Sequence, residues 1–154
     1  MLKLKHIPVK SFGENIAYIY NGCSLYKVDD LNKVTKLEIH KGNKTIYAFL
    51  QIVAEEGVLA ADEIGLNDDA FNTLNMSEGT EVHVSLAAPS ASTQALRRKI
   101  SGEVLTSGEY AAIVNDISAG RYSKMDIAAF LVACSASMSS TELVSLLWWL
   151  KRFC

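Results

Sequence analysis

The sequence predicts an α+β protein in which a small β-barrel-like domain over residues 1–88 precedes an α-helical bundle segment over residues 89–154. Three observations predict this division. Strand patterns dominate the first 88 residues, and helix patterns dominate the rest. The net charge changes from −4 in the first part to +2 in the second. Residues 89–92, Pro-Ser-Ala-Ser, have the small and polar composition of a short linker.

The strands of the first part are indicated by β-branched and aromatic residues that end at turn dipeptides. Asn21-Gly22 and Gly42-Asn43 are such dipeptides, and the second predicts a tight hairpin. The strand that follows this hairpin is apolar on both faces, so we expect both faces to be covered. The expected elements are strands over 16–20, 34–40, 45–53 and 81–85 and one helix over 68–74.

Capping boxes predict three helices in the second part. Each pairs a hydroxyl residue with an acid three positions later and precedes apolar residues spaced i, i+3, i+4, i+7. A further helix over 93–101, with Leu96 and Ile100 facing inward, should end at Gly102. Four short helices with tight loops should pack as an antiparallel bundle. The boxes are Thr106/Glu109, Ser123/Asp126 and Ser139/Glu142, and their stripes are Tyr110-Ile113-Val114-Ile117, Ile127-Phe130-Leu131-Cys134 and Leu143-Leu146-Leu147-Leu150.

Composition and charge argue against several classes of function. A net charge of −2 gives no electrostatic reason to expect nucleic acid or an anionic membrane as a partner. We find no apolar run of about 18 residues for a membrane span and no secretory signal at the N-terminus. Cys23, Cys134 and Cys154 form no CxxC pair and suit a reducing cytoplasm.

We expect no catalytic, phosphate-binding or metal-ligating residue in this chain. His6, His40 and His83 are scattered, without a second His or a Cys at metal-ligand spacing. The sequence contains no GxSxG, GxGxxG or GxxxxGK[ST] motif. The basic cluster Arg97-Arg98-Lys99 fans over roughly 200° of a helix, which is typical of a solvated face, with contact to an anion or an acidic partner as the alternative.

The last expected helix is apolar nearly all round, because residues 146–150 read Leu-Leu-Trp-Trp-Leu. A helix of this kind is expected to be buried on every side. Either Trp148 and Trp149 pack onto another subunit, or the chain has lost its continuation.

The second part resembles the N-terminal helical segment of the thymidine phosphorylase family, which includes pyrimidine-nucleoside phosphorylases and archaeal AMP phosphorylases. Residues 1–88 resemble the extra N-terminal domain of the longer members, a small barrel often compared with double-psi barrels. Those members are the AMP phosphorylases and type 2 thymidine phosphorylases. The matching segments are 63–66, 78–84, 96–110, 113–117, Gly120, 122–123, 127–131, Met138 and 140–146.

The resemblance implies a pentosyltransferase that uses inorganic phosphate as co-substrate, with no metal or other cofactor, in cytoplasmic nucleoside salvage. It also implies a homo-oligomer. The phosphate- and pyrimidine-binding motifs of the family should follow residues 138–146, so we expect this chain alone to be inactive. Truncation or a frameshift would explain both the missing motifs and the apolar tail, 147–154, and a natural tail is the alternative. Two alternatives remain open: a non-catalytic oligomerisation or interaction module, and phosphorolysis of a nucleoside monophosphate such as AMP.

Overall fold

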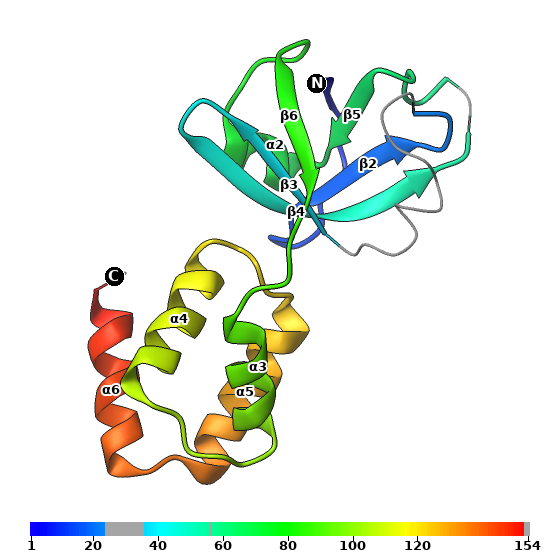
Figure 1. The fold of residues 1–154 in the computed structure, drawn as a ribbon. Helices are drawn as coiled ribbons and strands as arrows, with labels where there is room; N and C mark the ends of the chain where they lie inside the picture. The colour runs from blue at the N-terminus through cyan, green and yellow to red at the C-terminus, as the bar shows by residue number, and fades with distance from the viewer. Residues whose placement is uncertain (24–35, 56, 153–154) are drawn as a thin grey trace. The chain divides into compact units, whose positions relative to one another are not determined.

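Two units make up the chain, Met1–Ala87 and Ala88–Cys154, in a computed structural model that describes residues 1–23, 36–55 and 57–152 (Figure 1). The division falls one residue before the boundary expected from the sequence. Strands form the first unit and helices the second, so the α+β fold class is confirmed.

The first unit is a closed barrel of six strands with the spatial order β1-β5-β2-β4-β3-β6. Strands β1 and β5 are parallel, as are β2 and β4, and the remaining neighbours are antiparallel. One helix, α2, follows β5. The elements are β1 (Leu2–His6), β2 (Ile16–Tyr20), β3 (Lys36–Lys41), β4 (Lys44–Val53), β5 (Glu63–Leu66), α2 (Asp68–Leu74) and β6 (Glu81–Leu86).

All four predicted strands and the predicted helix of this unit are present, although residues 34 and 35 of the second predicted strand lie outside the described residues. The prediction omitted β1 and β5. Strand β1 alternates Leu and Lys, a signal that could have been used, whereas β5 has only four residues.

Alternation along the strands fills the barrel, because every second side chain points inward. The inward Leu37, Ile39 and Ala48 are completely buried. The outward apolar side chains of β4 are half-buried, so the expected cover on both faces of this strand is only partial on the outward face. Phe49 on that outward face instead lies beneath the Lys36 ammonium group, which is 4.3 Å from the ring centre.

A buried amide, Asn67, ties the loop before β2 to the start of α2. Its Oδ1 accepts from the backbone N–H of Ala70 at 3.1 Å, as a helix N-cap, and from that of Ile16 at 2.9 Å. Its Nδ2 donates to the carbonyl of Glu14 at 2.9 Å. Asn67 is fully buried, so each of these bonds satisfies a group that water cannot reach.

The second unit contains four helices, and the three predicted capping boxes are confirmed with both of their hydrogen bonds. Helices α3 and α4 are each followed, after one capping residue, by a glycine with positive φ that closes a Schellman motif, Gly102 and Gly120. Helix α3 packs on α4 and α5, and α4 packs on α6 (Figure 1). The helices are α3 (Ser92–Ile100), α4 (Ser107–Ser118), α5 (Lys124–Ser137) and α6 (Ser140–Lys151).

The inward face of α6 differs from the predicted stripe. Glu142, Leu146 and Trp149, spaced i, i+4, i+7, face the bundle. Since α6 packs mainly on α4, only one narrow line of its residues is covered. On α3, Lys99 is buried in place of Ile100. The predicted core positions that are exposed instead are Ile100, Leu131, Leu143, Leu147 and Leu150.

Replacing Asn67 with alanine should destabilise the barrel by about 2–4 kcal/mol, because the change removes an N-cap and leaves the N–H groups of Ala70 and Ile16 without this partner. Hydrogen exchange of the barrel amides measures this, since both tryptophans of the chain lie in α6. The control is Asn72→Ala at an exposed position of α2. Equal exchange in the two variants would contradict the role of Asn67.

Candidate functional site

The helical unit contains a buried carboxylate with several hydrogen bonds, that of Glu142, a residue 2% exposed. Its Oε1 accepts from the Lys99 ammonium at 2.9 Å and from the Tyr110 hydroxyl at 3.0 Å. The backbone N–H of Leu105 donates to the same oxygen at 2.9 Å. Its Oε2 accepts from the backbone N–H and hydroxyl of Ser139 at 2.9 and 3.0 Å. We call Glu142, Lys99 and Tyr110 the Glu142 hub.

Three helices supply the side chains of the hub, and the loop before α4 supplies the N–H group of Leu105. Lys99 comes from the last turn of α3, Tyr110 from the first turn of α4, and Glu142 from the first turn of α6. The Lys99 side chain is completely buried, and its ammonium also donates to the carbonyls of Ser137 at 2.8 Å and Glu103 at 3.3 Å. Every charge in the hub is thus paired and hydrogen-bonded, as a buried ion pair requires.

The pKa values of the hub follow from this geometry. Burial on its own would raise the pKa of Glu142, but hydrogen bonds from the backbone N–H groups of Ser139 and Leu105 and from Lys99 lower it well below its ordinary value. Burial, together with the hydrogen bond to the Glu142 carboxylate, raises the pKa of Tyr110. Burial also raises the pKa of the neighbouring Cys134 thiol.

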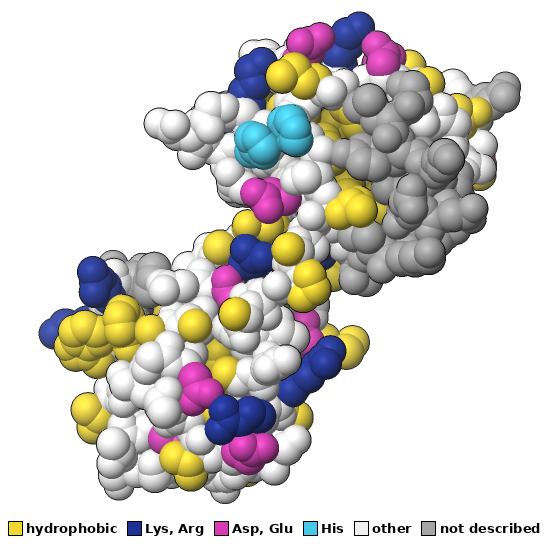
Figure 2. Space-filling model, in the orientation of Figure 1, with side chains coloured by type: hydrophobic (Ala, Val, Ile, Leu, Met, Phe, Trp, Pro, Cys, Tyr) yellow, Lys and Arg dark blue, Asp and Glu magenta, His cyan; other side chains and the backbone are white. Residues whose placement is uncertain are grey.

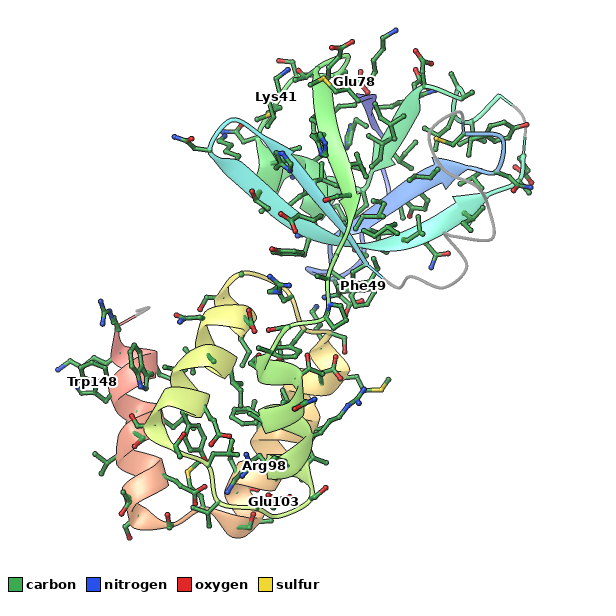
Figure 3. The ribbon with its side chains drawn as sticks, viewed as in Figure 1. Lys41, Phe49, Glu78, Arg98, Glu103 and Trp148 are labelled. Carbon is green, nitrogen blue, oxygen red and sulfur yellow. The ribbon has the colours of Figure 1, made fainter. Side chains whose placement is uncertain are left out.

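The basic cluster expected on one solvated face is divided in the structure. Lys99 points into the hub. Arg98 instead forms ion pairs with Glu103 at 2.8 Å and Glu109 at 2.6 Å, and Figure 3 shows Arg98 beside Glu103. The interpretation of all three residues as a solvated face is therefore wrong for Lys99. Sequence reasoning missed it because the partner, Glu142, lies 43 positions away along the chain.

Two of the three histidines, expected to be scattered, come together on the barrel. His40 on β3 and His83 on β6 are register partners, and their rings stack with centroids 4.6 Å apart. His6 instead bonds to Asp68 at 2.7 Å and stacks on Phe71. Within residues 1–23, 36–55 and 57–152, we find no group of three or more His, Cys, Asp or Glu side chains placed to hold a metal ion.

A shallow pocket of about 390 Å³ lies beside the turn between α5 and α6. Its lining combines a thiol, three hydroxyls and apolar side chains, so it offers no charged group to a ligand. Ser139, one of the hydroxyl residues, already belongs to the capping box of α6. The lining residues are Cys134, Ser135, Met138, Ser139, Ser140, Leu143 and Leu146.

The outward side of α6 is an exposed apolar surface, which we call the α6 face. Hydrophobic side chains gather on this side of the helical unit (Figure 2), and Trp148 points away from the bundle (Figure 3). None of the helices in the described part of the chain has the length and apolar character needed to cross a membrane. The α6 face comprises Leu143, Val144, Leu147, Trp148 and Leu150, which are 40–67% exposed.

Changing Glu142 to glutamine should destabilise the helical unit by about 3–5 kcal/mol, because the Lys99 ammonium then remains buried without its counter-charge. Urea unfolding followed by the fluorescence of the α6 tryptophans measures this loss. The matched control is Glu103→Gln, whose carboxylate is exposed and pairs with Arg98 at the surface; little change is expected there. A Glu142→Gln variant as stable as this control would refute the hub.

The stability of the helical unit should depend on pH through Glu142. Since the pKa of Glu142 is lower in the folded than in the unfolded state, the unfolded state binds more protons in acid. The stabilisation is therefore complete at neutral pH and is lost progressively below about pH 5, because an unfolded glutamate titrates near pH 4.3. The stability difference between the wild type and Glu142→Gln should narrow from pH 6 to about pH 3; a constant difference would contradict the lowered pKa.

Comparison with known proteins agrees with this architecture. Residues 93–148, which span α3 to most of α6, match the model of the glycosyl transferase family, helical bundle domain. The chain is 39% identical, over 94% of its length, to a protein from Methylococcus capsulatus named "Putative thymidine phosphorylase". Proteins of the same name from Albidiferax ferrireducens and Rhodopseudomonas palustris are 35% and 37% identical over 86% and 94% of the chain.

The matched part of each relative is limited. The chain spans 28%, 25% and 28% of the lengths of these three proteins. The resemblance to the thymidine phosphorylase family is thereby confirmed over both units. Residues 93–148 are thus similar to the helical bundle domain of the glycosyl transferase family, and the chain as a whole is similar to about a quarter of the length of relatives named "Putative thymidine phosphorylase".

Proposed function

We propose that this chain is the barrel and helical-bundle portion of a pentosyltransferase that catalyses the phosphorolysis of thymidine. In that reaction a phosphate oxygen attacks the anomeric carbon of the sugar while the bond to the base breaks. The products are thymine and 2-deoxyribose 1-phosphate. The observation that carries the proposal is the 39% identity to the Methylococcus capsulatus relative over 94% of the chain.

In this proposal the chain supports an active site and does not form one. The Glu142 carboxylate already accepts five hydrogen bonds and is buried, so the hub has no capacity for a substrate. The shallow pocket beside α6 has no cation in its lining to bind phosphate. The proposed setting is nucleoside salvage in the reducing cytoplasm, which agrees with the free thiols of Cys23 and Cys134.

A chimera tests this proposal. The segment of the Methylococcus capsulatus relative that matches this chain is replaced by the chain itself, and phosphate-dependent release of thymine is measured. We expect the chimera to retain thymidine phosphorolysis and the chain alone to show none. A folded but inactive chimera beside an active parent would contradict the proposal, as would turnover by the chain alone.

The substrate can be tested in the same assay. Long family members include AMP phosphorylases, so a nucleoside monophosphate is the alternative substrate that the resemblance brings. AMP is supplied to the parent and the chimera in parallel with thymidine. Release of adenine without release of thymine would contradict thymidine as the substrate and support AMP in its place.

A second candidate function is self-association, and the α6 face favours it. Large exposed apolar patches usually mark a contact with another protein. We propose that two copies of the chain cover this face for each other, as an oligomerisation module with or without catalysis. The five apolar side chains of the α6 face and the outward orientation of Trp148 support this proposal.

Trp148→Glu should convert the oligomer to a single chain of 16.8 kDa, because a carboxylate cannot be buried in an apolar contact without a partner. Light scattering coupled to size exclusion gives the mass. The control is Met125→Glu, an exposed apolar position on α5. A wild-type chain that is already monomeric at high concentration would refute association through this face.

A further inference from the structure

Helix α3 begins without the capping box that stabilises the starts of the other helices of its unit. Helices α4, α5 and α6 each begin with a hydroxyl residue and a carboxylate in a capping box. The N-cap of α3 is Ala91, and no side chain at that position caps the helix. The first N–H groups of an α-helix have no partner within the helix, so the start of α3 depends on groups from elsewhere.

Asp116, near the end of α4, holds this start. Its Oδ2 accepts from the hydroxyls of both Ser90 and Ser92. The hydroxyl of Ser92, a residue only 3% exposed, also hydrogen-bonds with that of Tyr122 in the turn after α4. Ser90 in turn accepts from the backbone N–H groups of Ser92 at 3.3 Å and Thr93 at 3.1 Å. A carboxylate beside a helix N-terminus is also favoured by the helix dipole.

Arg121 binds an earlier residue of the linker, Ala88, to the helical unit. Its Nη2 donates to the carbonyl of Ala88 at 2.9 Å, and its Nε lies 3.6 Å from Oδ1 of Asp116. Arg121 is positioned by the Schellman turn of α4, in which its N–H donates to the carbonyl of Asp116 at 2.9 Å. The linker is therefore bound to the helical unit from Ala88 onward.

The preceding residue is bound to the barrel. The N–H of Ala87 donates to the carbonyl of Lys36 at 3.1 Å, which continues the pairing of β6 with β3 by one residue. Consecutive residues are thus held by different units, and their Cα atoms are about 3.8 Å apart. Pro89 restricts the backbone of Ala88 to extended conformations. The free rotation left between the two anchors is mainly φ and ψ of Ala87 and φ of Ala88.

We propose that Asp116 is a latch that confines the joint between the barrel and the helical unit to the Ala87–Ala88 link. With the latch closed, the flexible segment between the units is the Ala87–Ala88 link alone. Without it, residues 88–91 join the flexible segment, and the tether between the units becomes several times longer. The latch is a conformational device of this chain and does not depend on the proposed enzymatic reaction.

Amide dynamics and proteolysis of the full chain test the latch. In the wild type, the heteronuclear NOEs of Ala88, Ser90, Ala91 and Ser92 should equal those of α4. In Asp116→Ala they should fall to values typical of a mobile segment, whereas the amides of Leu96 and Ile113 keep theirs. Elastase, which accepts small side chains, should cut between residues 88 and 91 at least tenfold faster.

Two further variants make the test decisive. Asn115→Ala, an exposed neighbour on α4, should leave the NOEs and the cleavage rate unchanged. Ser90→Ala removes one of the two hydroxyls on Asp116 and should give an intermediate rate, which carries the test if Asp116→Ala does not fold. The proposal would be overturned if the amides of residues 88–92 were already mobile in the wild type. It would also be overturned if the cleavage rate were unchanged in both Asp116→Ala and Ser90→Ala.

Discussion

The buried ion pair between Glu142 and Lys99 is the constraint on which the helical unit depends. Two charges removed from water are tolerated only where hydrogen bonds surround them. Meeting that condition requires α3, α4, α6 and the loop before α4 to arrive at one point. The hub therefore selects one arrangement of helices whose apolar stripes alone would permit several, since hydrophobic burial has no direction.

The barrel also contains a buried polar residue with several hydrogen bonds, but this residue is neutral. Asn67 is buried like Glu142, and each of them takes part in capping a helix start and also hydrogen-bonds to a distant loop. Asn67 is the N-cap of α2, whereas Glu142 is the acid of the α6 capping box. In both units a polar residue at a helix start fixes the path of a loop. Asp116 performs a related task for α3, but from a neighbouring helix.

Local signals explain what could be predicted from the sequence. A capping box spans only four residues, so the starts of α4, α5 and α6 could be predicted from the sequence. Turn dipeptides in the same way indicated where β2, β3 and β4 lie. Long-range pairing explains what could not be predicted. Lys99 looked like part of a basic surface, and the stacking of His40 on His83 depends on strand register. The rotation of the α6 stripe also followed from packing, because the helix contributes Glu142 to the core instead of Leu143.

Sequence patterns also gave little information about a catalytic or binding site. The sequence contains none of the motifs GxSxG, GxGxxG and GxxxxGK[ST], and the polar groups of the Glu142 hub bond to one another. The relatives extend well beyond the part that this chain matches. The chemistry proposed for the whole protein therefore depends on that similarity, whereas the stability of the two units follows from the residues described.

A double-mutant cycle on Lys99 and Glu142 tests the central claim most directly. The free energy of unfolding is measured for the wild type, Lys99→Met, Glu142→Gln and the double variant. The hub predicts that the double variant is less destabilised than the sum of the single variants, with a coupling of about 2–3 kcal/mol. Additive effects would mean that the two charges do not stabilise each other, and would contradict the account.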